Sequence, residues 1–450
     1  MDTPSTGPDQ ERPPVSRTKA IRDGLWDRIV SFDNLWQAAR ESRKGKRFRQ
    51  SAAGFERCLG QNLTALRDQL LAGSYQPGPY TTFTIYEPAK RLISAAPYRD
   101  RVVHHALCRV IEPLFEPAFV FDSYANRKAQ SAKGSAVRST NSPGTLAAAS
   151  VAREFFRSGQ GTTRPFSRSG TLAAASVARE FFRRNRRGDP PIVQELSTAV
   201  PFCASLQNCK GTHAALDRAT HYARRYPYVL QCDIRLFFPS LDHRILLQRL
   251  QRRIACFQTL GLCSTILNNS NPQEPAEFYF DGDDLFTPFE RRRGLPIGNL
   301  TSQFWANVYM DPFDHYVKDD LGVKGYVRYV DDFLLFADSK AELHDLRELL
   351  DRRLAGEFRL LLHPRKTRIY PVSEGIPFLG FRVFPTHRRL LPASVKRARR
   401  RLGELSGDDP LLVRDRVRAW IAHARHGDTY GLRRHLLRAL VLRPHNEPGS

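Results

Sequence analysis

The sequence has 450 residues, of which 41% are hydrophobic, and its 70 lysines and arginines against 46 aspartates and glutamates give a net charge of +24. This apolar content is enough to build a core, so the composition excludes a wholly disordered chain. The charge favours a polyanionic partner, because each Lys or Arg that neutralises a phosphate releases condensed counterions. A basic surface without any ligand is the alternative interpretation.

Residues 1–24 are predicted to form a disordered tail, because their first part is polar and rich in proline and lacks the basic start and apolar stretch of a signal peptide. No apolar run approaches the roughly 18 residues of a transmembrane helix, so we expect no contact with a membrane. The seven cysteines are scattered, and no pair has the C-x₂-C spacing of a zinc site. These features predict a cytoplasmic protein in a reducing compartment.

Apolar residues at helical spacing predict a helical region over residues 25–71 and a helix over residues 101–116, with a short strand at 82–86 between them. The pattern after residue 210 is mixed. Strands are predicted at residues 228–233, 326–330 and 333–336, a pair of short β segments at 376–383, and helices at 241–254, 301–316 and 342–354. The C-terminal residues 385–450 are predicted to be helical, and they hold fifteen basic and six acidic residues.

A direct repeat interrupts this pattern. Residues 144–157 read Gly-Thr-Leu-Ala-Ala-Ala-Ser-Val-Ala-Arg-Glu-Phe-Phe-Arg, and residues 170–183 are identical to them. Two copies are too few for a solenoid, so we favour a tandem duplication inside a loop insertion over residues 129–209. Surface loops accept long insertions at low entropic cost. An added RNA-binding arm is the alternative.

Three aspartates lie where predicted strands end or turn. Asp233 ends the strand 228–233, and Asp331 and Asp332 lie at the turn of the hairpin 326–336. Carboxylates are hard oxygen ligands of the kind that Mg²⁺ prefers, and nucleotide polymerisation uses two such ions held close together. An Asp pair at a turn is also ordinary turn chemistry, so neither motif is specific by itself.

The order of the neighbouring motifs resembles that of the reverse transcriptases. Between the Asp233 strand and the hairpin lies Arg-Arg-Arg-Gly-Leu-Pro-Ile-Gly-Asn-Leu-Thr-Ser-Gln at residues 291–303. After the hairpin come Leu-His-Pro-Arg-Lys-Thr at 362–367 and Phe-Leu-Gly-Phe at 378–381, and residues 87–107 look like the fingers motifs of that family. The resemblance covers about 25–128 and 210–445.

This resemblance implies an α+β fold of the right-hand polymerase type. Its parts would be fingers at residues 25–128, a fingers/palm catalytic domain with an antiparallel sheet at 210–384, and a helical basic thumb at 385–450. The insertion 129–209 separates Ser-Tyr-Ala-Asn-Arg-Lys at 123–128 from Lys-Gly-Thr-His-Ala at 210–214, which adjoin in the family.

The resemblance also implies an RNA-directed DNA polymerase that works by two-metal-ion nucleotidyl transfer. Asp233, Asp331 and Asp332 would be the catalytic ligands of two Mg²⁺ ions, with Mn²⁺ as a substitute. Lys366 would protonate the leaving pyrophosphate, and its alternative is a solvated surface lysine.

Further residues match positions that contact the nucleotide in the family. Lys90 and Arg91 would clamp the triphosphate through charge-assisted hydrogen bonds. Phe238 would be the aromatic steric gate against a ribose 2′-hydroxyl, or else a core residue. The residues that should line the nascent base pair and the template are Ile297, Gly298 and Gln303.

The motif Ile-Gly-x-x-x-Ser-Gln at 297–303 replaces the Gln-Gly-x-x-x-Ser-Pro of group II intron and retron enzymes. This variant resembles the reverse transcriptases of diversity-generating retroelements, which copy a template-repeat RNA into cDNA and misincorporate opposite adenine. The resemblance implies as partners an RNA template, a DNA primer, deoxynucleoside triphosphates and a small basic accessory protein, in a bacterial or phage-encoded system. The alternatives are a retron-like or phage-defence reverse transcriptase, or an inactive RNA-binding scaffold if the insertion breaks the fingers.

Overall fold

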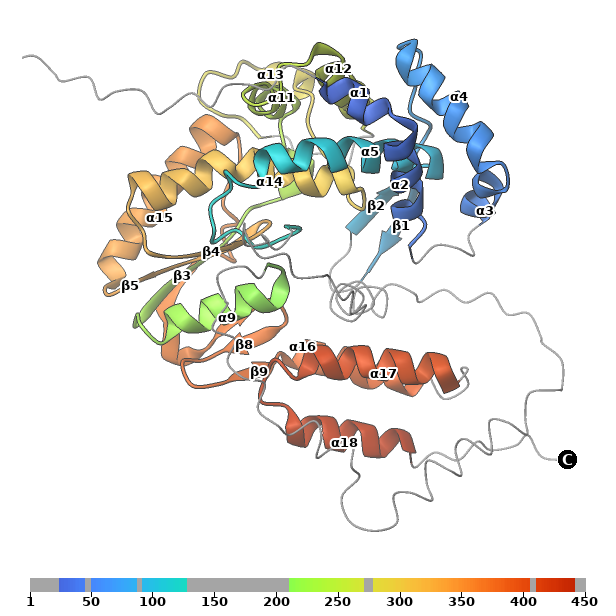
Figure 1. The fold of residues 1–450 in the computed structure, drawn as a ribbon. Helices are drawn as coiled ribbons and strands as arrows, with labels where there is room; N and C mark the ends of the chain where they lie inside the picture. The colour runs from blue at the N-terminus through green and yellow to red at the C-terminus, as the bar shows by residue number, and fades with distance from the viewer. Residues whose placement is uncertain are drawn as a thin grey trace, which may run out of the picture.

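The computed structural model describes residues 24–44, 50–86, 91–127, 210–270, 278–404 and 410–441. The predicted tail, apart from Gly24, and the predicted insertion 129–209 lie outside these residues. Helices and antiparallel sheets alternate along the described chain (Figure 1), which agrees with the predicted α+β class. Within the described ranges, no helix is both long enough and apolar enough to cross a membrane.

The N-terminal part consists of helices around a small two-stranded sheet. Its elements are α1 (Leu25–Val30), α2 (Phe32–Ser42), α3 (Gln50–Arg57), α4 (Leu59–Leu71), β1 (Thr81–Ile85), β2 (Arg91–Ala95) and α5 (Tyr98–Phe115). Ser31 begins α2 as an N-cap, since its hydroxyl accepts a hydrogen bond from Asn34 N at 3.3 Å. Asn34 in turn donates to Ala106 O at 3.0 Å, which ties α2 to the buried α5.

The central part begins with helix α9 (Thr212–Ala223). It contains a four-stranded sheet of order β4-β5-β3-β6, in which every neighbouring pair is antiparallel. The strands are β3 (Tyr228–Asp233), β4 (Gly325–Tyr329), β5 (Asp332–Ala337) and β6 (Arg368–Pro371). The helices after β3 are α10 (Phe237–Ser240), α11 (His243–Gln251), α12 (Phe257–Asn268), α13 (Thr287–Glu290), α14 (Leu300–His315) with the π-helical turn η2 (Tyr316–Asp320), and α15 (Lys340–Phe358).

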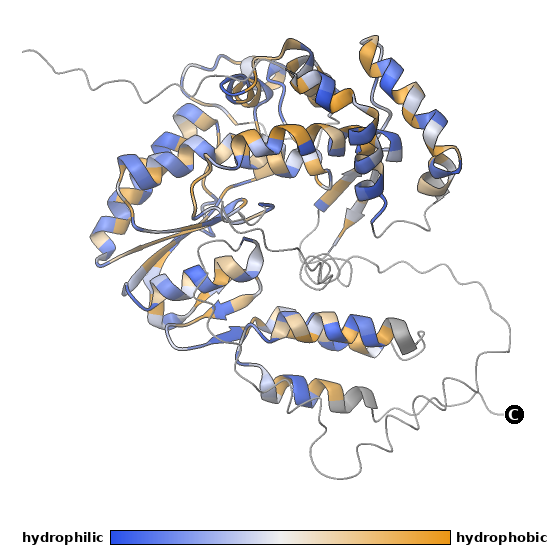
Figure 2. Ribbon diagram, viewed as in Figure 1, coloured by the Kyte–Doolittle hydropathy of each residue, from blue (hydrophilic) through white to orange (hydrophobic). Residues whose placement is uncertain are grey.

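The inner strands β3 and β5 pack on both faces of this sheet, and most of their buried side chains are apolar. Leu230 and Phe333 belong to the core cluster that includes α5, α14 and α15. Val229 and Leu334 belong to a second cluster with α9 and the C-terminal helices. In Figure 2 the apolar colouring accordingly runs along α14 and α5 in the middle of the molecule. The sheet is therefore a rigid platform between two cores.

The C-terminal part begins with η3 (Val372–Glu374) and a three-stranded sheet of β7 (Ile376–Phe378), β8 (Phe381–Val383) and β9 (Arg388–Leu390). Three basic helices follow: α16 (Pro392–Glu404), α17 (Pro410–Ala424) and α18 (Tyr430–Val441). Figure 1 places them below α9, on the side of the sheet away from α14 and α15. These helices lie in residues 385–450, which are predicted to be a helical thumb, whereas strand β9 at the start of this range is not predicted.

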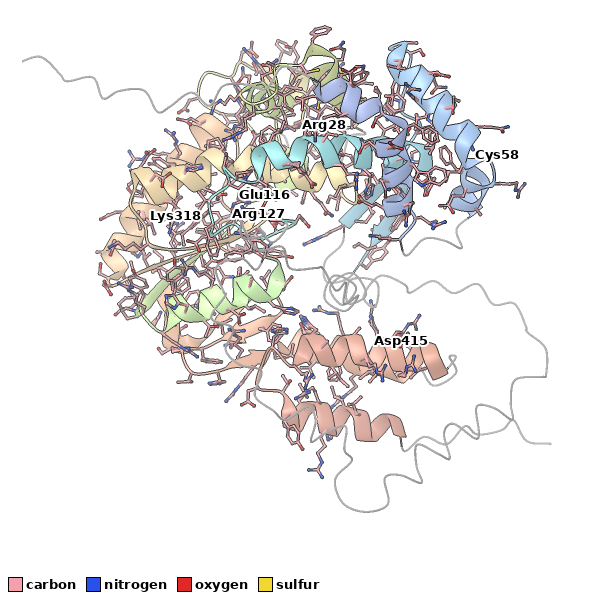
Figure 3. The ribbon with its side chains drawn as sticks, in the orientation of Figure 1. Arg28, Cys58, Glu116, Arg127, Lys318 and Asp415 are labelled. Carbon is pink, nitrogen blue, oxygen red and sulfur yellow. The ribbon has the colours of Figure 1, made fainter. Side chains whose placement is uncertain are left out.

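The segments before and after the predicted insertion are in direct contact. Gly211 N donates to Tyr124 O at 3.0 Å, and the Lys210 ammonium lies 4.1 Å from the centre of the Phe121 ring. Arg127, whose side chain is 1% exposed, donates from Nε to Glu116 at 2.8 Å, and Figure 3 labels these two residues next to each other. Among the described residues, the elements on either side of residues 128–209 are thus packed together.

Candidate active site

The tip of the β4–β5 hairpin presents two of the three predicted aspartates. Tyr329 pairs with Asp332 in the ladder, so the loop between the strands is only Val330 and Asp331. Val330 has a φ of 62°, a left-handed conformation that a β-branched residue rarely adopts. The turn that carries Asp331 is therefore strained and needs support from its surroundings.

The third aspartate reaches the same place from the adjacent strand. Asp233 and Asp332 are direct partners in the antiparallel pairing of β3 with β5. Ile234 N donates to Asp331 O at 3.2 Å, which joins the end of β3 to the hairpin turn. The sheet thus brings Asp233 next to Asp331 and Asp332, which follow it by about 100 residues in the sequence.

The proximity of these carboxylates changes their acidity. Burial, together with the negative charges of Asp331 and Asp233, raises the pKa of Asp332 to about 8. The pKa of Asp331 is also raised, first by burial and then by Asp233. Bringing three carboxylates together at a partly buried edge costs free energy that a bound cation would offset.

The donor set fits Mg²⁺ in its chemistry, because all three side chains offer hard carboxylate oxygens. Over the ranges that the structure describes, no three His, Cys, Asp or Glu side chains are already arranged as a metal cage. The convergence of these three carboxylates is the observation that points to a cation here, since a divalent ion would offset their negative charge.

Lys366 lies against the strand-end carboxylate. Its ammonium donates to both oxygens of Asp233 at 3.0 Å, and its side chain is 58% exposed. The backbone around it is fixed, since His363 N donates to Asp233 O at 2.7 Å. The sequence motif at 362–367 thus places an ammonium group directly beside Asp233.

Arg91 faces the same site from the N-terminal part of the molecule. It is the first residue of β2, and its side chain is exposed. Its positive charge offsets part of the rise in the pKa of Asp331. The neighbouring Lys90 lies outside the described residues.

The loop before α14 closes the gap between β2 and the central part. Gly298 has a φ of 114°, and a Cβ on it would lie 3.1 Å from Ile93 Cγ2, so both conformation and packing require glycine. Ser94 N donates to Ile297 O at 3.0 Å. The side chains of Ile297 and Gln303 are both partly exposed.

Asn299 is a structural residue of this site that the sequence motifs do not reveal. Its buried side chain accepts from Ala96 N at 3.2 Å and donates to Ser94 O at 2.9 Å. An Asn directly before a helix normally indicates an N-cap, but here the side chain makes no capping bond to α14. It joins β2 to the loop instead.

Phe238 lies in the short helix α10, and its side chain is partly exposed beside the core. Its ring lies 5.3 Å from that of Phe237, edge to face, and its carbonyl accepts from Leu295 N at 2.9 Å. Phe238 is therefore connected to the same loop as Ile297. Both the packing and the gate interpretations are compatible with this position.

Comparison with known proteins identifies a domain. Residues 191–383 match the family described as "Reverse transcriptase (RNA-dependent DNA polymerase)", and this range contains Asp233, Asp331 and Asp332. Protein YkfC of Escherichia coli (strain K12) is 23% identical over 367 residues, which cover 74% of this chain and 73% of that protein.

Two solved structures are more distantly similar. The telomerase from Candida albicans, in complex with a fragment of telomeric RNA, is 10% identical with a TM-score of 0.36, over 81% of this chain and 55% of that chain. A partial Cas6-RT-Cas1–Cas2 complex is 18% identical with a TM-score of 0.31, over 74% of this chain and 43% of that chain. The chain thus spans about half the length of these larger chains, and TM-scores this low do not establish a common overall shape.

Proposed function

We propose that this chain, through the reverse transcriptase domain that residues 191–383 match, has a right-hand polymerase fold and copies RNA into DNA where strands β3 and β5 meet the β4–β5 turn. The observation that supports this most directly is the pairing of Asp233 with Asp332 beside Asp331. Three carboxylates at the ends of adjacent strands provide what nucleotidyl transfer needs, namely fixed oxygen ligands for divalent cations.

Asp233, Asp331 and Asp332 would hold Mg²⁺, or Mn²⁺ in its place. When bound, these ions would make the primer 3′-hydroxyl more acidic and stabilise charge on the triphosphate. The chain itself contributes the positions of the three carboxylates on paired strands and a turn, which keeps them in place during the reaction.

Two cationic side chains complete the site. Arg91 on β2 would bind the triphosphate together with Lys90. Lys366 would orient Asp233 through its two hydrogen bonds and donate a proton to the leaving pyrophosphate.

We further propose that Phe238, Ile297, Gly298 and Gln303 shape the space for the nascent base pair. Phe238 would exclude a ribose 2′-hydroxyl. Ile297 stands where related enzymes have Gln, so the side chain at this position makes no hydrogen bonds that would test the fit of a base. The expected result is low fidelity opposite adenine, as in a diversity-generating retroelement.

In that setting the template would be a template-repeat RNA, and the enzyme would act in the cytoplasm with a small basic accessory protein. A retron-like or phage-defence reverse transcriptase is the alternative within the same class. The Ile-Gly-x-x-x-Ser-Gln motif at 297–303 favours the retroelement type.

Primer extension on an RNA template with Mg²⁺ tests the activity. The wild type should extend the primer, and Asp331→Ala should reduce the rate by at least about 10³-fold because a metal ligand is lost. An inactive wild type that still binds RNA would favour the scaffold alternative. For the subtype, Ile297→Gln should lower misincorporation opposite adenine, and an unchanged error rate would contradict the proposed role of Ile297.

A further inference from the structure

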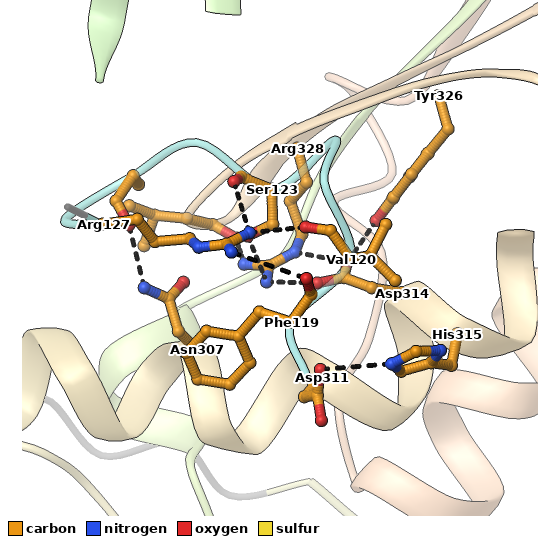
Figure 4. A network of polar contacts seen from close by, with 12 residues as sticks. Phe119, Val120, Ser123, Arg127, Asn307, Asp311, Asp314, His315, Tyr326 and Arg328 are labelled. Atoms are coloured by element: carbon orange, nitrogen blue, oxygen red, sulfur yellow. Dashed lines mark hydrogen bonds and ion pairs between the residues drawn. The ribbon is translucent and has the colours of Figure 1, made fainter. Parts of the chain in front are cut away.

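A buried cluster of polar and charged side chains lies directly behind the turn that carries Asp331. Arg328, three residues before Asp331, is among the largest fully buried side chains of the described chain. Its guanidinium donates to both oxygens of Asp314 on α14, from Nε to Oδ1 and from Nη2 to Oδ2, each at 2.6 Å (Figure 4). Both side chains are only 1% exposed. A bidentate pair of this kind fixes the plane of the guanidinium.

The remaining nitrogen of the guanidinium reaches the strained turn. Arg328 Nη1 donates to Val330 O at 3.0 Å. This oxygen belongs to the peptide group that joins Val330 to Asp331, and Val330 is the residue with a φ of 62°. The hydrogen bond therefore holds the peptide plane from which the Asp331 side chain begins.

Neighbouring groups keep Arg328 in this position. Tyr326 donates from its hydroxyl to Asp314 Oδ1 at 2.7 Å, and Arg328 Nη2 donates to Ser123 Oγ at 3.0 Å. The backbone of Arg328 also accepts from Tyr124 N at 3.0 Å and donates to Asp122 O at 2.9 Å. Asp314, Ser123 and the backbone hydrogen bonds of Arg328 thus fix the position from which its guanidinium contacts Val330.

We propose that Arg328 is a positioning residue for polymerisation: by holding the Val330 carbonyl it maintains the strained turn and directs the Asp331 carboxylate toward Asp233. The inference depends on the proposed role of Asp331 as a metal ligand. A buried ion pair contributes little net stability compared with apolar residues of similar volume, so stability alone is a weak reason for such a pair behind this turn.

The test uses the full chain with Arg328→Met and Asp314→Leu combined, so that no unpaired charge stays buried. We expect the variant to stay folded, with a melting temperature lowered only by the lost acceptor of the buried Tyr326 hydroxyl, and a KM for deoxynucleoside triphosphate within about twofold. Its kcat should fall by about 10- to 100-fold, and half-maximal activity should need more Mg²⁺, as for other residues that orient metal ligands.

Tyr326→Phe is the matched control, because it removes one hydrogen bond from the same Asp314 and leaves the bond to Val330 in place. Its kcat should stay within about twofold of the wild type. Wild-type kcat and Mg²⁺ dependence in the double variant would overturn the proposal, and so would equal losses in the double variant and the control.

If the double variant does not fold, Arg328→Lys gives the same decision. A lysine keeps a positive charge beside Asp314, but it has no planar fork that reaches Asp314 and Val330 together. We expect a retained melting temperature with the same loss of kcat, and full kcat would contradict the proposal. Activity in Asp331→Ala would instead show that the proposed catalytic role of Asp331 is wrong, whatever the Arg328 variants do.

Discussion

The Lys366 ammonium lies 3.0 Å from each carboxylate oxygen of Asp233, although the two residues are 133 positions apart. Its positive charge also offsets part of the rise in the pKa values of Asp331 and Asp332. A single exposed lysine therefore compensates part of the negative charge of the whole aspartate group.

Lys366→Met should slow nucleotide addition by about 10- to 100-fold, because it removes both a proton donor and the partner of Asp233. Lys366→Arg separates these roles, since arginine keeps the charge but does not release a proton at neutral pH. We expect the Arg variant to be nearly as slow as the Met variant in single-turnover primer extension. A wild-type rate in Lys366→Arg would restrict Lys366 to charge compensation.

The raised pKa of Asp332 predicts a pH-dependent stability of the metal-free protein. Folded Asp332 keeps its proton up to a pKa of about 8, whereas the unfolded side chain loses it near pH 4. The folded state thus binds more protons between these values, and the free energy of unfolding should fall as pH rises.

Between pH 6.5 and 8, in the presence of a chelator, this fall should be at most about 2 kcal/mol. Asp332→Asn should flatten the slope in urea unfolding. Added Mg²⁺ should stabilise the wild type more at pH 8 than at pH 6.5, since it replaces the proton. An equal slope in the wild type and the Asn variant would argue against the raised pKa.

A histidine cluster between α9 and the C-terminal helices predicts the opposite pH dependence at lower pH. His213 stacks on His426 with ring centres 3.5 Å apart, and its Nε2 lies 3.4 Å from Nδ1 of His423. Burial, together with the charge of a neighbouring histidine, lowers the pKa of each to about 4. The rings are therefore uncharged at neutral pH and pack against one another.

Because unfolded histidine binds a proton near pH 6.5, the stability from these three residues should be lost as pH falls from 6.5 toward 4. The loss should be on the order of 1 kcal/mol per histidine at pH 5. His213→Phe keeps a ring on His426 and should make the wild-type slope shallower in chemical unfolding. If the slope does not change, the cluster does not control acid stability.

The charge of the C-terminal helices predicts a salt-dependent contact with nucleic acid. Arg399 on α16 and Arg418 on α17 are exposed. If they bind template–primer phosphates, each change to Ala should reduce the slope of log affinity against log salt by about 1, as a filter-binding titration would measure. Arg352 on α15 is an exposed control that should leave the slope unchanged. Equal effects at all three sites would exclude a specific contact with α16 and α17.

Local patterns predict the elements of the site well. The strand 228–233 has the predicted bounds as β3, and α14 (Leu300–His315) agrees with the predicted helix 301–316 within one residue at each end. Apolar alternation and helical spacing are local signals, so a single sequence carries them. The region 25–71, in contrast, is predicted without internal division, and the structure divides it into four helices.

Tertiary contacts could not be predicted in this way. Asn299 resembles an N-cap in the sequence, but its partners on β2 are about 200 residues away. Val330 adopts a backbone conformation that its own side chain disfavours, and the hydrogen bond from Arg328 that holds it depends on Asp314. These hydrogen bonds and this backbone conformation depend on residues that are distant in the sequence, so they leave no periodic pattern in it.

The hydrogen bond between Gly211 N and Tyr124 O closes the chain at a point where the length of the connecting segment has little effect on stability. With the two flanking segments already joined, a longer connection between them adds only a slowly growing entropy term to the unfolding equilibrium. A duplication at the level of the gene, which we propose for the identical segments 144–157 and 170–183, would therefore cost the fold little stability. The same junction is a natural place to join a foreign domain to this enzyme or to shorten its chain.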